Sequence, residues 1–341
     1  MKPPNFNIVV QTTKGEPGKI SNKQVNSDGV VTFDYSFPSF SDAKTDTLVV
    51  TCDACQEFGD RQTMDITMVP TLVGFFNGVF NTRRQAEQGL QQLIIQTNNV
   101  KDKQNLKFEL FYIQTGSGRP GEATAISALQ DLAETFDQRS RELDGVLANR
   151  WEVFWDISGA VHASINSGIG GLLKLLGNKG LDLAQLVDSI FNSLLGKTVG
   201  ILARMLGNPP TALDLAAHSA KLASYADAGY PVVLVAHSQG NLFVNQANDS
   251  LLAYKADAPV KVIHIAPASP TLRGDYVLAD IDLVINALRI QGISSVPLAN
   301  ISVALSSADA SGHKLIETYL DASRAALARF KSMIKTAIEG V

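Results

Sequence analysis

One short stretch of the chain combines a nucleophilic side chain with the backbone signals that would expose it. Residues 232–240, Val-Val-Leu-Val-Ala-His-Ser-Gln-Gly, run from apolar residues into a turn in which Ser238 lies between the small residues Ala236 and Gly240. The apolar run predicts a strand covered on both faces, as in a parallel sheet. Residues 241–247 predict a helix with one apolar face. So tight a turn between strand and helix would present the serine hydroxyl as a nucleophile for acyl transfer.

The stretch resembles the nucleophile elbow of the α/β-hydrolase superfamily, whose motif is G-x-S-x-G. Ala236 stands where the first glycine usually lies, and its methyl group is small enough to allow a close approach of helix and strand. The resemblance covers about residues 65–115 and 209–341. It implies an α/β fold, a mostly parallel sheet with helices on both faces, and a catalytic acid and histidine after Ser238. The alternative is a chance Ser-x-Gly sequence at the end of a strand.

A serine hydroxyl needs a histidine base, and the resemblance places that base after the serine. Among the five histidines, His313 is the well-placed one, in a small Ser-Gly-His-Lys turn between a predicted last strand, Ile301–Leu305, and a predicted final helix. The alternative for His313 is a residue at a helix N-terminus with no chemical role. His237, the direct neighbour of the serine, is interpreted as structural because this position points away from the substrate in the family geometry.

The acid that would orient the base has three candidates, Asp275, Asp280 and Asp282. We favour Asp282, which directly precedes the apolar run Leu-Val-Ile, because some related bacterial hydrolases have a similar Asp-x-Val-Ile passage ahead of a Gly-His turn. Each of these aspartates could instead cap a helix at the surface.

The oxyanion hole of such an enzyme takes two backbone N–H groups. The resemblance implies that one belongs to Gln239 and the other to Gly78 or Val79, in the loop after a predicted strand at 69–76. Asn77 replaces the usual histidine of the lead-in. This loop can also be a plain turn in which Asn81 or Thr82 caps the following helix.

The pattern of strands and helices divides the chain into three parts. Residues 1–64 contain short alternating segments, Phe6–Gln11, Val30–Phe37 and Thr47–Cys52, and predict a small β-rich segment. Residues 26–35 are faintly similar to bacterial immunoglobulin-like modules, and extra edge strands of the main sheet are the alternative. Residues 65–115 and 209–341 predict the hydrolase core.

Strands of that core are predicted near 69–76, 106–113, 231–236 and 260–265. A helix is predicted from Thr82, and a last helical element from Lys314 to Ile338. Six residues of this last element share an apolar stripe: Leu315, Tyr319, Ala326, Phe330, Met333 and Ala337.

Residues 116–208 predict a helical cap or lid inserted into the core. Its second half is leucine-rich with interspersed glycines, which is typical either of ordinary helical core or of a mobile lid that meets acyl chains or a lipid surface. Together with Phe75, Phe76 and Phe80 near the oxyanion loop, this composition favours an ester substrate with an apolar acyl group.

Composition excludes several other classes of protein. The chain has 341 residues, 45% hydrophobic and 18% charged, with a formal net charge of -4 and no basic block, so a nucleic-acid partner is not expected. No apolar stretch approaches the roughly 20 residues that span a bilayer. The implied triad needs no metal or organic cofactor. The lone pair Cys52 and Cys55 is half of a four-ligand zinc site and favours a local disulfide or inert thiols.

These features predict a serine carboxylesterase or lipase. The rivals are an acyltransferase with the same triad and a non-catalytic binding module on a hydrolase scaffold. The start of the sequence lacks a signal-peptide core. The β-rich N-terminal segment and the close cysteine pair nevertheless favour an extracytoplasmic location (periplasmic, surface or secreted), with a cytoplasmic one as the alternative.

Overall fold

The structure, a computed structural model, describes two compact units of the chain. The described residues are 6–26, 30–52, 61–78, 81–99, 105–113, 211–287, 296–304, 306–309 and 312–341. Those up to Thr71, together with residues 105–107, form the first unit, and the remaining ones form the second. The predicted cap, residues 116–208, lies outside the described residues.

The first unit consists of two small antiparallel sheets. One sheet has the order β1 (Phe6–Thr12), β4 (Lys44–Cys52), β5 (Arg61–Met68), and the other pairs β2 (Lys19–Val25) with β3 (Val31–Ser36). The predicted strands correspond to β1, β3 and β4. Sequence reasoning missed β2 and β5, because their residues are mostly polar and exposed and lack the apolar alternation that marks a half-buried strand.

The second unit is built on a five-stranded parallel sheet. Its strand order is β10 (Asp275–Val277), β9 (Val260–Ile265), β8 (Val232–His237), β6 (Thr71–Phe76), β7 (Leu106–Phe111). Every residue of β6 and β8 is buried, which explains their continuous apolar sequences. The α/β class and the parallel sheet predicted from the sequence are therefore confirmed.

The predicted last strand at Ile301–Leu305 is wrong over its described residues, 301–304. Only a single parallel bridge joins Ile301 to Ala279. The side chain of Asn300 occupies the sheet edge instead: its amide oxygen accepts from Leu278 N at 2.9 Å, and its amide nitrogen donates to Tyr276 O at 2.9 Å. Beyond the bridge, the carboxylate of Asp280 accepts from Val303 N at 3.0 Å, so a side chain takes a backbone donor that a strand through residues 301–304 would have paired.

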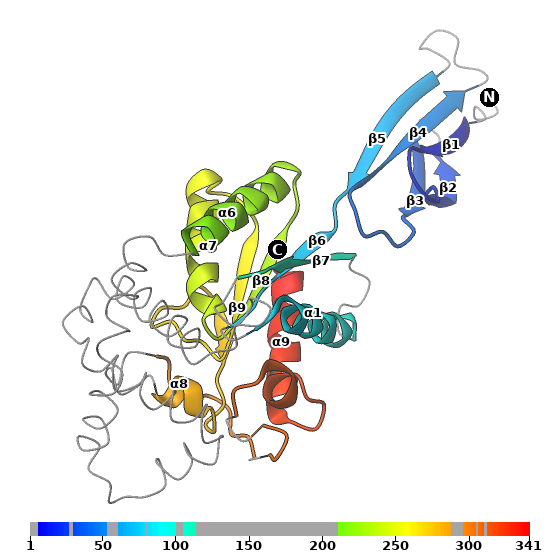
Figure 1. Cartoon of the computed structure of the whole chain (residues 1–341). Helices are drawn as coiled ribbons and strands as arrows, with labels where there is room; N and C mark the ends of the chain where they lie inside the picture. Colours follow the sequence, from blue (N-terminus) through cyan, green and yellow to red (C-terminus); the bar gives the residue numbers. More distant parts are fainter. Residues whose placement is uncertain are drawn as a thin grey trace, which may run out of the picture. The chain divides into compact units, whose positions relative to one another are not determined.

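Helices cover both faces of this sheet. Helix α6 (Thr211–Asp227) packs against α7 (Gly240–Tyr254), while α1 (Arg83–Asn98) packs with α9 (Ala325–Glu339). The strands lie between these two pairs (Figure 1). Of the two possible caps, Asn81 and Thr82, it is Thr82 that caps α1, in a reciprocal capping box with Gln85.

The predicted single element from Lys314 to Ile338 is two helices. A π-helical turn, η4 (Leu315–Tyr319), is separated from α9 by Leu320–Arg324. The break occurs at Asp321, whose carboxylate accepts from both the backbone N–H and the hydroxyl of Ser323, and this local turn competes with a continuing helix. All six residues of the predicted apolar stripe are buried, so the stripe is confirmed.

Candidate active site

Ser238 lies where the strand order of the parallel sheet reverses. From β6 the chain crosses to β7 on one side, and from β8 it crosses to β9 on the other, while β6 and β8 are direct neighbours. Ser238 follows the last residue of β8. In open α/β sheets, ligands bind in the crevice that this reversal leaves at the carboxyl ends of the strands.

The turn at Ser238 has the strained backbone predicted from its small neighbours. Ser238 has a φ of 56°, in the left-handed region that side chains rarely adopt. A Cβ atom on Gly240 would lie 2.6 Å from Phe76 O, and one on Gly78 would lie 2.7 Å from Ser238 Cβ. The two glycines therefore allow α7, the end of β6 and the serine to meet.

A buried polar network holds this strained turn. Asn241 donates its amide N–H groups to Ser238 O at 2.8 Å and to Ile265 O at 3.0 Å. Its amide oxygen lies 2.8 Å from His264 Nδ1, while His264 Nε2 accepts from Arg273 N at 2.9 Å. His264 is thus neutral with the proton on Nδ1, and burial together with the charge of Arg273 lowers its pKa to about 3.

The structure brings Ser238, His313 and Asp282 together from three separate segments. Nε2 of His313 lies 3.0 Å from Ser238 Oγ. Nδ1 of His313 lies 2.9 Å from Oδ2 and 3.1 Å from Oδ1 of Asp282. A hydroxyl, an imidazole and a carboxylate in this sequence of contacts form the arrangement that activates a serine nucleophile.

Asp282 is the one of the three candidate acids that meets the histidine. Its carboxylate is fully buried and also accepts from Ile285 N at 2.9 Å and from the Tyr319 hydroxyl at 2.7 Å. Asp280 instead bonds Ser302 Oγ at 2.6 Å and Val303 N at 3.0 Å, and Asp275 is exposed on the edge strand β10. Asp282 also caps the short helix α8 (Leu283–Ala287), as in the alternative interpretation, but it does so from a buried position and not at the surface.

Tyr319 is a residue of this site that sequence reasoning assigned only to the core. Its hydroxyl donates to Asp282 and accepts from Ala279 N at 3.2 Å, and its side chain is fully buried. Burial and the neighbouring carboxylate of Asp282 raise its pKa well above the usual value, so the hydroxyl stays a donor. The apolar stripe identifies Tyr319 as buried, but nothing in the sequence indicates which carboxylate its hydroxyl meets.

The protonation of His313 is set by two opposing effects. Burial by itself lowers the pKa of this imidazole, whereas Asp282, by charge and hydrogen bonding, and Asp309, by charge, raise it. The net result is a raised pKa. The site therefore stabilises the protonated form of His313.

His237 supports the histidine loop from the end of β8. Its Nε2 donates to the backbone oxygen of His313 at 2.9 Å, and the two rings lie 5.0 Å apart. Burial and, second, the charge of His313 lower the pKa of His237 to about 3, so it remains neutral. The structural interpretation of His237 is consistent with this contact, and the loop that it holds is the one that carries His313.

The two neutral histidines predict a pH dependence of stability. In the unfolded chain each binds a proton below a pKa of about 6.5, whereas in the folded chain His237 and His264 do so only near 3. The unfolded state therefore holds more protons in this window, and the free energy of unfolding falls as the pH drops, by about 1.4 kcal/mol per pH unit for each histidine.

The pH dependence of the free energy of unfolding is measured by urea unfolding of the wild type and of His264→Gln from about pH 7 to about pH 5. We expect the free energy of unfolding to change less steeply with pH in the variant, by the amount that corresponds to about one bound proton. Equal slopes would mean that His264 is not buried in its neutral form.

The predicted oxyanion loop lies against the serine. Asn77, which is 1% exposed, accepts from Ile113 N at 2.8 Å and donates to Ile113 O at 3.2 Å, which ties the end of β6 to the end of β7. Asn81 donates to Gly78 O at 3.0 Å. Gly78 is thereby held next to Ser238, and Gln239 lies at the N-terminus of α7, where the helix dipole favours negative charge. Val79 lies outside the described residues.

The structure contradicts one interpretation of the neighbouring aromatic residues. Phe75 and Phe76 are 1% and 0% exposed, and Phe76 stacks on Phe111 in the core at 4.8 Å. They fill both faces of a fully buried strand, so they cannot line an acyl-binding surface. Phe80 lies outside the described residues.

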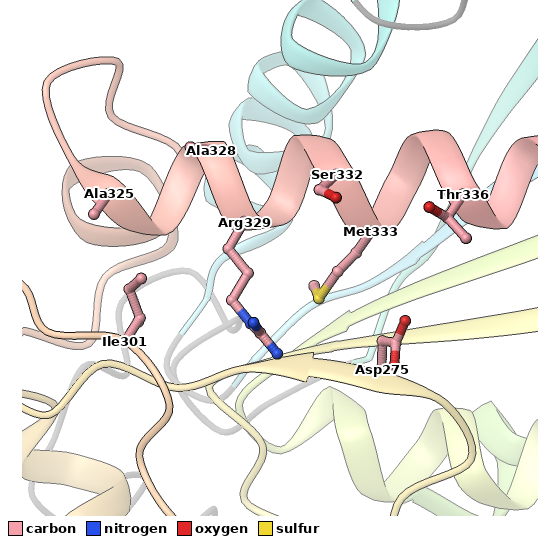
Figure 2. A pocket seen from close by; sticks show the side chains of 8 residues that line it. All are labelled: Asp275, Ile301, Ala325, Ala328, Arg329, Ser332, Met333 and Thr336. Carbon is pink, nitrogen blue, oxygen red and sulfur yellow. The ribbon is translucent and has the colours of Figure 1, made fainter.

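A cavity of about 530 Å³ lies elsewhere in the second unit. It is lined by residues of α9 together with Asp275 and Ile301 (Figure 2). None of Ser238, His313 and Asp282 lines it. Its position beside the edge strand β10 therefore separates it from the triad.

The remaining sequence-based expectations concern cysteines, metals and membranes. Cys52 is disulfide-bonded, and Cys55 lies outside the described residues. Within the described ranges, no group of three histidine, cysteine or acidic side chains is placed to hold a metal ion. No helix in that part of the chain has the length and apolar character needed to cross a bilayer.

Comparisons with protein-family models, with curated proteins and with solved structures find no significant match to this chain.

Proposed function

We propose that this chain is a serine hydrolase that cleaves carboxylic esters, on an α/β-hydrolase core. The observation that carries the proposal is the contact sequence in which His313 lies 3.0 Å from Ser238 Oγ and 2.9 Å from Asp282. The strand order of the sheet, the position of Ser238 at its reversal and the left-handed φ of the serine support it.

The proposed reaction proceeds in two acyl-transfer steps. His313 Nε2 takes the proton from Ser238 Oγ while Oγ attacks the ester carbonyl carbon. The electron pair of the carbonyl double bond moves to the carbonyl oxygen. Backbone N–H groups of Gln239 and of Gly78 or Val79 stabilise that oxyanion. His313 then gives its proton to the departing alcohol, and an acyl-enzyme remains. Water, deprotonated by His313, then attacks the acyl carbon. The bond from that carbon to Ser238 Oγ breaks, His313 returns its proton to Oγ, and the acid is released.

The proposed acyl preference is for an apolar group. An apolar acyl group is suggested by the leucine-rich composition of residues 170–206, a segment that includes Leu172, Leu173, Leu175 and Leu176. The same segment would make any contact with a lipid surface. A chain-length series of p-nitrophenyl esters, from acetyl to dodecanoyl, tests the preference, and kcat/KM that is highest for acetyl would contradict it.

Labelling by a fluorophosphonate probe tests the nucleophile directly. We expect the folded wild type to be labelled at one site, because a hydroxyl paired with His313 attacks phosphorus as it attacks an ester carbonyl. Ser238→Ala is the control and should show neither labelling nor ester hydrolysis above background, with an unchanged thermal unfolding midpoint. Folded wild type that is not labelled would refute the proposal and favour a non-catalytic scaffold.

The proposed location is extracytoplasmic, because disulfides persist in oxidising compartments and Cys52 is disulfide-bonded. Cell fractionation of the native protein, with the thiol content measured under denaturing conditions, tests it. Free thiols in protein recovered from the cytoplasm would contradict it.

A further inference from the structure

Asp309 makes hydrogen bonds on both sides of the proposed catalytic base. Its carboxylate oxygen Oδ2 accepts from Lys314 N, the residue after His313, at 2.7 Å. Its backbone oxygen accepts from Gly312 N, the residue before His313, at 3.3 Å. Its side chain is 1% exposed, so this carboxylate is a buried group of the histidine loop and not part of a solvated surface.

The same carboxylate oxygen also fixes the loop to the next element of the chain. It accepts from Thr318 Oγ1, within η4, at 2.7 Å. Lys314 is the N-cap of η4, and its side chain provides no capping bond. Asp309 therefore satisfies a backbone donor at the start of this turn, which leads directly to Tyr319 and its contact with Asp282.

The turn that carries His313 needs such hydrogen bonds to keep its conformation. Gly312 has a φ of 65°, and a Cβ atom there would lie 2.5 Å from Ile281 O. The chain must therefore pass through a left-handed glycine immediately before His313. Glycine imposes no local conformational preference of its own, so the hydrogen bonds of Asp309 and His237 help to fix the geometry of the loop.

We propose that Asp309 is a positioning residue of the site, a second buried carboxylate that holds His313 toward Ser238 and favours its positive charge. This inference rests on the proposed function of the triad. Asp309 acts through the loop and through its electric field, since its hydrogen bonds go to Lys314, Thr318 and Gly312.

The charges around His313 determine whether removing Asp309 raises or lowers the pKa of the imidazole. Asp282 bonds the imidazole, Asp309 contributes a second negative charge, and the neighbouring His237 and Tyr319 are neutral. The ammonium group of Lys314 lies 3.8 Å from Glu317 and 3.1 Å from Ala308 O. Because negative charge dominates, removing Asp309 should lower the pKa of His313.

Asp309→Asn is the test variant, since an amide retains the shape and an acceptor oxygen but loses the charge. We expect the acid limb of the kcat/KM profile on p-nitrophenyl butyrate to move down by roughly one pH unit, with kcat lowered about tenfold. Thr318→Val should move the same limb upward by a smaller amount, because it keeps the carboxylate and removes a donor that partly neutralises it. Asp321→Asn, which removes a partly exposed carboxylate that bonds Ser323, is the charge control and should leave the profile unchanged.

An NMR titration of the His313 imidazole in the same proteins keeps this test separate from the proposed function. If the wild type is not labelled by the fluorophosphonate but Asp309→Asn still lowers the pKa of His313, the catalytic proposal fails and the placement of Asp309 stands. If labelling succeeds and the folded Asp309→Asn and Thr318→Val variants both leave that pKa and kcat unchanged, the inference on Asp309 is overturned.

Discussion

Replacing Asp282 with asparagine is expected to lower kcat about 10⁴-fold, the loss that the same change causes in well-studied serine proteases. One carboxylate oxygen accepts from His313 Nδ1 and the Tyr319 hydroxyl, and the other accepts from Ile285 N. An asparagine amide would direct its own N–H groups at one of these donors in either orientation. Where the amide nitrogen faces His313, the imidazole loses the acceptor that keeps its proton on Nδ1 and leaves Nε2 free to act as a base.

The measurement is kcat on p-nitrophenyl butyrate near neutral pH. Asp280→Asn and Asp275→Asn are matched controls, since both were candidate acids and neither side chain meets the histidine. We expect each to change kcat less than about threefold, because Asp280 bonds Ser302 and Val303 and Asp275 lies on the edge strand. A loss with Asp280→Asn that equals the loss with Asp282→Asn would show that the acid has been assigned wrongly.

Gly240→Ala is expected to destabilise the fold by about 2–3 kcal/mol and to remove most of the proposed esterase activity. An added Cβ would lie 2.6 Å from Phe76 O and 2.7 Å from Asn77 O. Both atoms belong to the backbone at the end of β6, so relief of the clash must move either that strand end or α7. Such a movement displaces the predicted oxyanion loop from Ser238.

Gly89→Ala is the matched control. Its added Cβ would meet the tip of the Leu315 side chain at 3.1 Å and the ring of Phe75 at 3.3 Å. Position 89 is inside α1, where alanine is favoured over glycine by about 1 kcal/mol, which offsets that contact. Urea unfolding of both variants should show a large loss only for Gly240→Ala. Equal stabilities for the two variants would mean that α7 and β6 are not as close as described.

The core strands and the elbow could be predicted from the sequence because their signals are local. A strand buried on both faces must be continuously apolar, and a tight strand-to-helix turn must have small residues beside the serine. These conditions hold within a few residues of Ser238. The predicted edge strand at Ile301 was wrong for a non-local reason, since the carboxylate of Asp280 takes the backbone N–H of Val303.

Other parts of the site had no local signal. Tyr319 and Asp309 lie in ordinary helical and loop sequence, and their roles come from contacts with Asp282 and on both sides of His313. Phe75 and Phe76 showed the opposite error. Aromatic residues beside a reactive loop suggested a substrate surface, whereas the sheet buries both of them in the core.

The sequence by itself determined the parallel α/β architecture, the position of Ser238 after a buried strand and the short list of possible bases and acids. Only the tertiary structure decided which aspartate lies 2.9 Å from the histidine and which lies apart from it. The reason is that Asp280 and Asp282 are nearly identical in local sequence context. What separates them is the direction of each side chain once the turn is packed, and that direction depends on His313 and Tyr319, more than thirty residues away along the chain.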